Sequence, residues 1–185
     1  MDSLRGKEGV AAKAYFDVFD EMILQNKAAF FFHRRSRRPP LDRVNAMLSF
    51  AYALLASDCA SALESVGLDS YIGMMHRDMP GRKSLALDLM EELRPCLADR
   101  FVLALINNRI IGEIDFDGSE SEAVLLTDQG RKAFLKSWQA RKQEKLTHPF
   151  LQEKNSWGLV PYVQALLLAR YIRGDLDEYP PFLWK

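Results

Sequence analysis

The sequence has little cysteine and no excess of charge of either sign. Its 25 basic and 25 acidic side chains give a formal net charge of zero, so composition alone does not indicate a nucleic-acid partner. The two cysteines, Cys59 and Cys96, have neither the spacing of metal ligands nor the pattern of a disulfide framework. We therefore expect a reducing, cytoplasmic environment.

A secretory leader and a long apolar run are also missing. The first residues lack the apolar core of a secretory signal, and no segment shows the uninterrupted apolar length of a membrane span. We expect no membrane partner. A length of 185 residues with 48% hydrophobic side chains instead predicts a single domain, residues 1–185, that buries its own apolar core.

Common catalytic and metal-binding motifs are absent as well. Without an HExxH motif, paired CxxC motifs or a glycine-rich phosphate loop, zincins, zinc fingers and nucleotide hydrolases lose their main support. His76-Arg77-Asp78 matches the catalytic-loop triplet of protein kinases, but Lys83 stands where that motif requires asparagine. A kinase is therefore not indicated, and no Ser or Cys nucleophile has an identifiable partner base.

Apolar residues recur at helical spacing through most of the chain, which predicts a mainly α fold of several helices. The expected helices run from Asp2 or Ser3 to the mid-twenties, from after Pro40 to about Val66, from Ser84 to about Leu105, from Thr127 or Asp128 through Leu146, and from Pro161 to Gly174. Asp42 and Ser84 are candidate caps, and Pro95 should kink the third helix. The aromatic ending, residues 179–185, should dock on the core.

One stretch has a different periodicity. Between Arg109 and Thr127 the apolar residues recur with period two, and Asp117-Gly118-Ser119 is a good hairpin turn. The sequence therefore predicts one small β-hairpin near residues 110–126.

Four polar residues fall where a binding site could form. Glu8 lies seven residues before Tyr15 on the same predicted apolar stripe, and Asp88 and Glu91 share one face of the third helix. His76 stands at the mouth of the loop before that helix. Three carboxylates and one imidazole form a donor set for Mg²⁺ or Mn²⁺, which can neutralise a phosphodiester and activate its attacker.

Without a family resemblance, structural roles are the favoured explanation of the same residues. Glu8 could be a first-turn acid of its helix, Asp88 and Glu91 a solvated edge, and His76 a hydrogen-bonded loop residue. Helical periodicity does not bring separate elements together in space. A basic cluster before the prolines, His33 to Arg38, is similarly open to two interpretations, a solvated connector or a phosphate-binding loop.

Longer segments resemble the CRISPR-associated spacer integrases, most closely those of type I, subtype C systems. The segments that carry the resemblance, in the family's order over essentially the whole chain, are Arg5–Phe16, Arg37–Ala46, Ser61–Asp69, Ser84–Pro95 and Tyr179–Lys185. The resemblance implies a helical catalytic domain that acts as a metal-dependent DNA endonuclease and integrase in CRISPR adaptation, an antiviral defence. In that reaction the 3′-hydroxyl of a DNA fragment attacks a phosphodiester at a repeat boundary, and water replaces the hydroxyl in the nuclease side reaction.

The resemblance also implies roles for individual residues. Glu8, His76 and Glu91 would be direct ligands of Mg²⁺ or Mn²⁺, and Asp88 would support the catalytic site. The side chains expected to contact DNA phosphates are Arg34, Arg35, Arg37, Arg38, Arg77, Arg82 and Lys83. The implied partners are DNA, a second copy of the chain in a homodimer, and the small second adaptation protein.

The sequence departs from the family pattern in one respect. Family members carry a β-rich N-terminal domain before the helix that bears Glu8, and this chain does not include it. The alternative function is therefore a non-catalytic helical scaffold for dimerisation and for partner or DNA binding.

Overall fold

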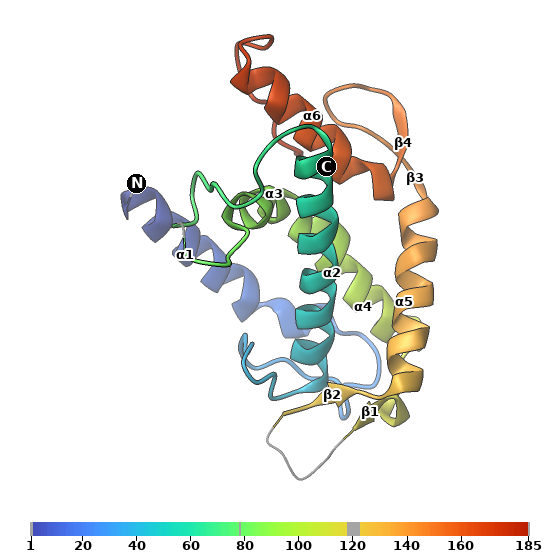
Figure 1. Cartoon of the computed structure of the whole chain (residues 1–185). Coiled ribbons are helices and arrows are strands. Elements are labelled where there is room, and N and C mark those ends of the chain that lie inside the picture. Colours follow the sequence, from blue (N-terminus) through green and yellow to red (C-terminus); the bar gives the residue numbers. More distant parts are fainter. Residues whose placement is uncertain (1, 78, 118–122, 185) are drawn as a thin grey trace. The chain divides into compact units, whose positions relative to one another are not determined.

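Helices account for most of residues 2–77, 79–117 and 123–184, the part of the chain that the computed structural model describes (Figure 1). They are α1 (Asp2–Asp17), α2 (Arg43–Ser65), α3 (Ser84–Leu93), α4 (Arg100–Asn107), α5 (Asp128–Gln143) and α6 (Val160–Ile172), with short 3-10 turns at Phe19–Met22, Glu113–Asp115 and Trp157–Leu159. Two antiparallel pairs of short strands join β1 (Phe116–Asp117) to β2 (Leu125–Leu126) and β3 (Lys145–Thr147) to β4 (Lys154–Ser156). The predicted mainly α fold is confirmed.

The chain divides into two compact units, each built from separate segments. The first unit comprises Met1–Ala51 and Asp99–Trp138, and the second comprises Tyr52–Ala98 and Gln139–Lys185. In the first unit, the ring of Phe101 on α4 lies 5.1 Å from that of Phe134 on α5, edge to face, within an aromatic core. In the second unit, α3 packs against α6.

The second helix, α2, forms where the sequence predicts it. Asp42 Oδ1 accepts the backbone N–H of Asn45 at 2.7 Å, as expected of a cap. Gly67 follows the helix with φ of 82°, a left-handed conformation that glycine adopts without steric cost. Most of the predicted apolar face is fully buried, namely Val44, Met47, Leu48, Ala51 and Leu55.

This helix is also long and apolar enough to cross a membrane, judged by length and composition alone. Half of the apolar stretch of α2 is buried inside the protein. The prediction concerned an uninterrupted apolar run, and α2 is interrupted by polar residues, so that prediction is not contradicted. The leucines and alanines of α2 outweigh Asn45 and Asp58 in the mean hydropathy of the helix.

The first helix is shorter than predicted. It ends at Asp17, and a 3-10 turn follows in place of further α-helix. Phe19 and Ile23 are fully buried, but Glu8 is exposed, so the expectation that Glu8 lies on a buried face is wrong. The reason is composition, because residues 6–14 are mainly glycine, alanine and charged residues and leave the helix little to bury before Tyr15.

The third predicted helix is interrupted at its proline, as expected. Between α3 and α4 the segment Arg94–Asp99 is π-helical. Pro95 has no N–H to donate to the carbonyl four residues earlier, so the α-helical ladder cannot continue through it. Ser84 begins α3 but its side chain does not cap it, because its hydroxyl donates to the Arg77 carbonyl oxygen at 3.2 Å.

The predicted hairpin is present but smaller. β1 pairs with β2, with Phe116 opposite Leu126. Residues 110–115 do not form the expected strand, since Glu113–Asp115 is a 3-10 turn that leaves Ile114 86% exposed. Of the predicted turn, Gly118 and Ser119 lie outside the described residues.

The second strand pair corrects the predicted fourth helix. α5 ends at Gln143, and Leu146 lies in β3 instead of in the helix. Lys145 pairs with Ser156 and Thr147 with Lys154. Strands of three residues are too short for a period-two pattern to stand out against the helical spacing that runs up to them.

The aromatic C-terminal segment docks on the second unit, as predicted. Phe182 is buried, and its ring lies 5.4 Å from that of His148 and 5.9 Å from that of Trp157. Its backbone N–H donates to Glu92 Oε2 on α3 at 2.9 Å. The tail is thereby tied to the helix that carries Asp88 and Glu91.

Candidate functional site

The loop before α3 folds back onto the carboxylate of Asp88. Oδ2 of Asp88 accepts the backbone N–H groups of Met74 and Met75, at 2.6 and 2.9 Å. Oδ1 accepts the backbone N–H of His76 at 2.9 Å and lies 2.6 Å from the Nδ1 atom of its ring. One carboxylate therefore fixes three successive backbone N–H groups and the histidine ring.

This contact determines which nitrogen of His76 is available. In the neutral ring, Nδ1 donates its proton to the ionised Asp88 carboxylate, and Nε2 keeps its lone pair. Metal-binding histidines are typically oriented in this way by a carboxylate behind the ring. The geometry thus suits a histidine that binds through Nε2, with Asp88 as the residue that positions it.

Gly73 allows the loop to approach the start of α3 this closely. A Cβ atom at this position would lie 2.6 Å from the His76 carbonyl oxygen and 2.6 Å from Ser84 Cβ. Ser84 is fully buried and donates to the Arg77 carbonyl oxygen on the far side of the histidine. A side chain at position 73 would therefore collide with the His76 carbonyl oxygen and with Ser84, and the backbone near His76 would have to move.

Glu91 lies on α3 about one turn after Asp88. Its Oε1 atom accepts from Arg94 Nη1 at 2.8 Å, and both side chains are partly buried. The guanidinium of Arg94 lies over the ring of Tyr52, 5.2 Å from its centroid. This arrangement restricts the rotamers of Glu91 and keeps an anionic oxygen near α3.

The structure thus brings together part of the predicted site. His76 and Asp88 are in contact and Glu91 is on the same helix as Asp88, whereas Glu8 is exposed on α1 and belongs to the first unit. Among the residues that the structure describes, no three His, Cys, Asp or Glu side chains are close enough to hold a metal ion. An imidazole nitrogen and a carboxylate oxygen in the second unit nevertheless match the donor chemistry of Mn²⁺ or Mg²⁺.

The basic loop before α2 contains one arginine that differs from its neighbours. Arg34, Arg37 and Arg38 are exposed, but Arg35 donates through Nη1 to Asn45 Oδ1 at 2.6 Å and through Nη2 to Ser49 Oγ at 3.1 Å. Arg35 thus connects the loop to the first turns of α2. Of the arginines in this loop that were predicted to contact phosphate, the three exposed ones are better placed to do so than Arg35.

Asn45, in the first turn of α2, holds this loop in place and was not predicted from the sequence. It is fully buried, its Nδ2 atom donates to the Arg34 carbonyl oxygen at 2.8 Å, and its Oδ1 atom accepts the Ser36 N–H at 2.9 Å. The signal was present, because Asn45 is a polar residue on the apolar face of a predicted helix, where a buried amide needs partners.

The other residues predicted to contact phosphate, Arg77, Arg82 and Lys83, lie between His76 and the start of α3. Arg77 and Lys83 are exposed and Arg82 is half-buried. Lys83 Nζ lies 3.3 Å from Glu64 Oε1. Hydrogen bonds from Ser70 and then from Lys83 hold the pKa of Glu64 below its ordinary value.

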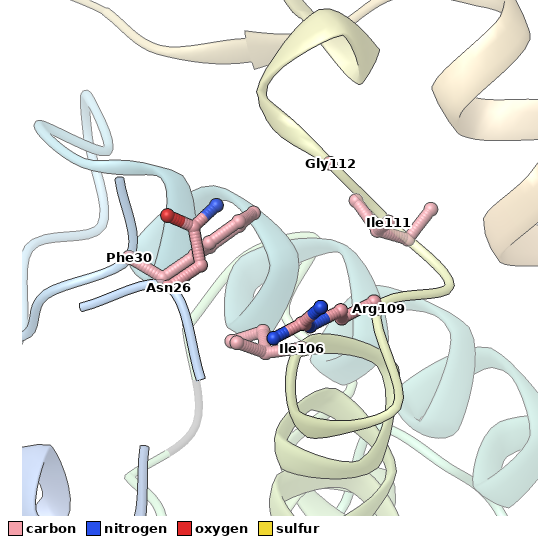
Figure 2. Close-up of a pocket in the computed structure, with 6 residues that line it drawn as sticks. All are labelled: Asn26, Phe30, Ile106, Arg109, Ile111 and Gly112. Atoms are coloured by element: carbon pink, nitrogen blue, oxygen red, sulfur yellow. The ribbon is translucent and has the colours of Figure 1, made fainter. Parts of the chain in front are cut away.

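A concave site of a different kind lies in the first unit (Figure 2). Its cavity of about 370 Å³ is lined by Asn26, Phe30, Ile106, Arg109, Ile111 and Gly112. The floor is apolar and buried, whereas Arg109 is exposed and donates to Gln25 Oε1 at 2.7 Å. None of the predicted site residues lines this cavity, so it is separate from the candidate site.

Comparisons with known proteins agree with the resemblance seen in the sequence. The family model described as CRISPR associated protein Cas1 matches residues 1–140. CRISPR-associated endonuclease Cas1 2 of Rhodospirillum rubrum is 59% identical over 184 residues, which cover all of this chain and 54% of that protein. CRISPR-associated endonuclease Cas1 of Leptospira interrogans is 50% identical over 185 residues, all of this chain and 72% of that protein.

Solved structures with the same fold include two assemblies. A casposase bound to integration product matches with a TM-score of 0.85 and 27% identity over 97% of this chain and 50% of that one. A partial Cas6-RT-Cas1–Cas2 complex matches with a TM-score of 0.80 and 28% identity over all of this chain and 53% of that one. The fold is therefore one that Cas1-type proteins share with a casposase. This chain belongs to the Cas1 family, and it spans about half the length of several of its relatives, 54% in the Rhodospirillum rubrum protein.

Proposed function

We propose that this chain is the metal-dependent catalytic part of a Cas1-type DNA endonuclease and integrase that acts in CRISPR spacer acquisition. Family membership and relatives named as endonucleases support the reaction class. The observation that carries the proposal for this chain is the 2.6 Å contact between His76 Nδ1 and Asp88 Oδ1, an arrangement typical of histidines that bind a metal through Nε2.

The residues divide into ligands and positioning groups. His76 would bind Mg²⁺ or Mn²⁺ through Nε2, with carboxylate oxygens supplied by Glu91 and Glu8. A divalent ion bound there would neutralise the negative charge of the phosphodiester and activate the oxygen that attacks it. Asp88 holds the ring of His76, and Arg94 holds the carboxylate of Glu91.

The basic side chains position the DNA. Their cations attract phosphates without reading sequence, which suits a substrate of variable sequence. The residues assigned to this role are Arg34, Arg35, Arg37, Arg38, Arg77, Arg82 and Lys83. A small second adaptation protein and a second copy of the chain are the proposed partners, in the cytoplasm and without a membrane contact, and the Cas1–Cas2 complex among the similar structures supports the first of them.

Cleavage of branched or linear DNA in the presence of Mn²⁺ tests the proposal. The variants His76→Ala and Glu91→Ala should abolish cleavage while circular dichroism shows unchanged helix content. Glu178→Ala, which removes an exposed acid near the C-terminus, is the matched control and should cleave like the wild-type chain. Unchanged cleavage by both site variants would disprove the assignment.

The alternative function is a non-catalytic scaffold for dimerisation and for partner or DNA binding. One observation favours it, because Leu159, Tyr162 and Leu166 expose apolar side chains at helical spacing at the start of α6. A metal titration separates the two functions. A ligand that binds only the folded chain must raise its melting temperature, so the absence of stabilisation by millimolar Mn²⁺ would favour the scaffold.

A further inference from the structure

Glu8 stands on a part of α1 that the core does not hold. Of residues 6–14, all but Ala12 are exposed, and burial begins only at Tyr15 and Phe16. Glu8 precedes Tyr15 by about two helical turns. The direction in which α1 carries Glu8 is therefore set at the C-terminal end of the helix, within the first unit.

Aromatic packing anchors this end of α1 but does not by itself fix the rotation of the helix. The ring of Tyr15 lies 5.2 Å from that of Phe16 and 5.8 Å from that of Phe19, in both cases edge to face. The ring of Phe19 lies 4.9 Å from that of Phe32. Such contacts tolerate small rotations of the helix, because the burial of apolar area has no preferred direction.

The hydroxyl of Tyr15 adds a contact that does have a direction. It donates to Asp99 Oδ2 at 2.9 Å, and Asp99 is only 1% exposed. Asp99 directly precedes α4 and belongs, like Tyr15, to the first unit. A hydrogen bond weakens steeply as its angle departs from linear, and one to a carboxylate is among the stronger kinds. This bond therefore fixes the side of α1 on which Tyr15 lies.

A helix that is fixed at Tyr15 is also fixed at Glu8. Positions seven apart differ by only about 20° around the axis of an α-helix, so the two residues lie on the same side of α1. Glu8 lies about 10 Å from Tyr15 along the axis, and a tilt of about 10° at Tyr15 would move it by about 2 Å. Carboxylate oxygens bind Mg²⁺ at about 2.0–2.1 Å, with a tolerance of about 0.2 Å, so such a tilt would remove Glu8 from an ion.

We propose that the hydrogen bond between Tyr15 and Asp99 aims Glu8 at the catalytic ion, which makes Tyr15 and Asp99 positioning residues for metal binding. The inference rests on the proposed function, in which Glu8 is a ligand. Both residues act on the ion only through Glu8. Loss of the Tyr15 hydroxyl leaves the aromatic packing of α1 in place but allows the exposed part of the helix to pivot.

Titration of the 185-residue chain with Mn²⁺, followed by the electron paramagnetic resonance signal of the free ion, tests the proposal. Tyr15→Phe removes only the hydroxyl and should raise the Kd for Mn²⁺ about tenfold, as loss of a group that orients a metal ligand does. Amide hydrogen exchange in residues 8–14 should become faster without metal, because the helix is less restrained. Tyr171→Phe removes the hydroxyl of an exposed tyrosine on α6 and is the matched control, with both measurements unchanged.

A double variant separates positioning of Glu8 from a general loss of stability. Glu8→Gln should itself weaken Mn²⁺ binding, and adding Tyr15→Phe to it should change the Kd by no more than about twofold, because both changes act through one ligand. An unchanged Kd for Tyr15→Phe alone, or an equal loss in both backgrounds, would overturn the inference and leave the proposed function intact. Binding by Glu8→Gln that equals that of the wild-type chain would instead refute Glu8 as a ligand, and the inference with it.

Discussion

Glu92, the neighbour of Glu91 on α3, shows what single residues contribute to this fold. Its carboxylate accepts hydrogen bonds from Gln164 Nε2 at 2.9 Å, from the Tyr179 hydroxyl at 2.8 Å and from the Phe182 backbone. Burial, followed by the charge of Glu92, raises the pKa of the Tyr179 hydroxyl above its usual range. An acid that the sequence analysis left unassigned is therefore the residue that ties the C-terminal tail to α3.

His148 extends the same network and gives stability a pH dependence. Its Nδ1 atom accepts the Leu151 N–H at 3.2 Å, and its Nε2 atom contacts Gln164 Oε1 at 3.0 Å. Protonation of Nδ1 would therefore place the new proton against the N–H of Leu151. Burial lowers the pKa of His148 below its ordinary value of about 6.5.

The free energy of unfolding should consequently fall as pH decreases below about 6.5, because the unfolded chain then takes up a proton that the folded chain does not. His148→Gln, which cannot be protonated, should show a weaker decrease of melting temperature between about pH 7 and pH 5. Identical pH profiles for the variant and the wild-type chain would contradict the assignment of this dependence to His148.

The sequence predicted which helix carries Asp88 and Glu91 better than it predicted the contacts of these residues. Periodicity placed Asp88 and Glu91 on one face of a helix, which α3 confirms. It could not show that the loop returns three N–H groups and an imidazole to Asp88, because that contact depends on the path of residues 73–77. Glu92 escaped notice because a half-buried acid on a helix has the same local sequence pattern as a solvated one.

At the scale of elements, the loop between α2 and α3 depends on Gly73. A Cβ at 2.6 Å from backbone and side-chain atoms requires something to move, and small-to-large changes in packed positions cost about 1–3 kcal/mol. Gly73→Ala should therefore lower the free energy of unfolding by about 1–3 kcal/mol in urea denaturation and displace the ring of His76.

Gly112→Ala provides the comparison for this prediction. Gly112 has an extended backbone conformation, and nothing lies within 4 Å of a Cβ at this position. Its change in stability should stay within about 0.5 kcal/mol. If Gly73→Ala were as well tolerated as Gly112→Ala, the inference that Gly73 is closely packed against His76 and Ser84 would be wrong.

Elements with clear ends were predictable from the sequence. α2 has Asp42 before it and Gly67 after it, and α6 has Pro161 near its start and Gly174, with φ of 80°, after its end. The errors occurred where such signals were weak. Nothing in the sequence ends α1 sharply at Asp17, and β3 and β4 are too short for periodicity to distinguish them from the end of α5.

At the scale of the whole molecule, each unit is assembled from segments far apart in the chain. Residues 1–51 join residues 99–138, and residues 52–98 join residues 139–185. Local periodicity contains no information about such pairings. The segments that resemble the Cas1 family supplied what periodicity could not, namely an expected relation between Glu8, His76 and Glu91.

The basic loop should dominate the salt dependence of DNA binding. Each phosphate contact adds about 0.9 to the slope of log affinity against log salt, so replacing Arg34, Arg37 and Arg38 with glutamine should reduce the slope for duplex DNA by about 3. Arg35→Gln should instead lower stability, because it removes hydrogen bonds to Asn45 and Ser49.

A triple variant elsewhere controls for net charge. Lys132, Lys136 and Lys145 are exposed and can be replaced with glutamine to remove the same total charge. This variant should keep a slope close to that of the wild-type chain. Equal reductions in both triple variants would show that the effect comes from net charge and not from the loop.

In the proposed site, His76 and Glu91 bind the catalytic ion while Asp88 orients the histidine. Anomalous diffraction from crystals of the chain grown with Mn²⁺ tests it most directly. A manganese peak should lie within bonding distance of Nε2 of His76 and of a carboxylate oxygen of Glu91, with the contact between Nδ1 and Asp88 retained. Crystals saturated with Mn²⁺ in which the ion binds elsewhere and leaves His76 without metal would contradict it.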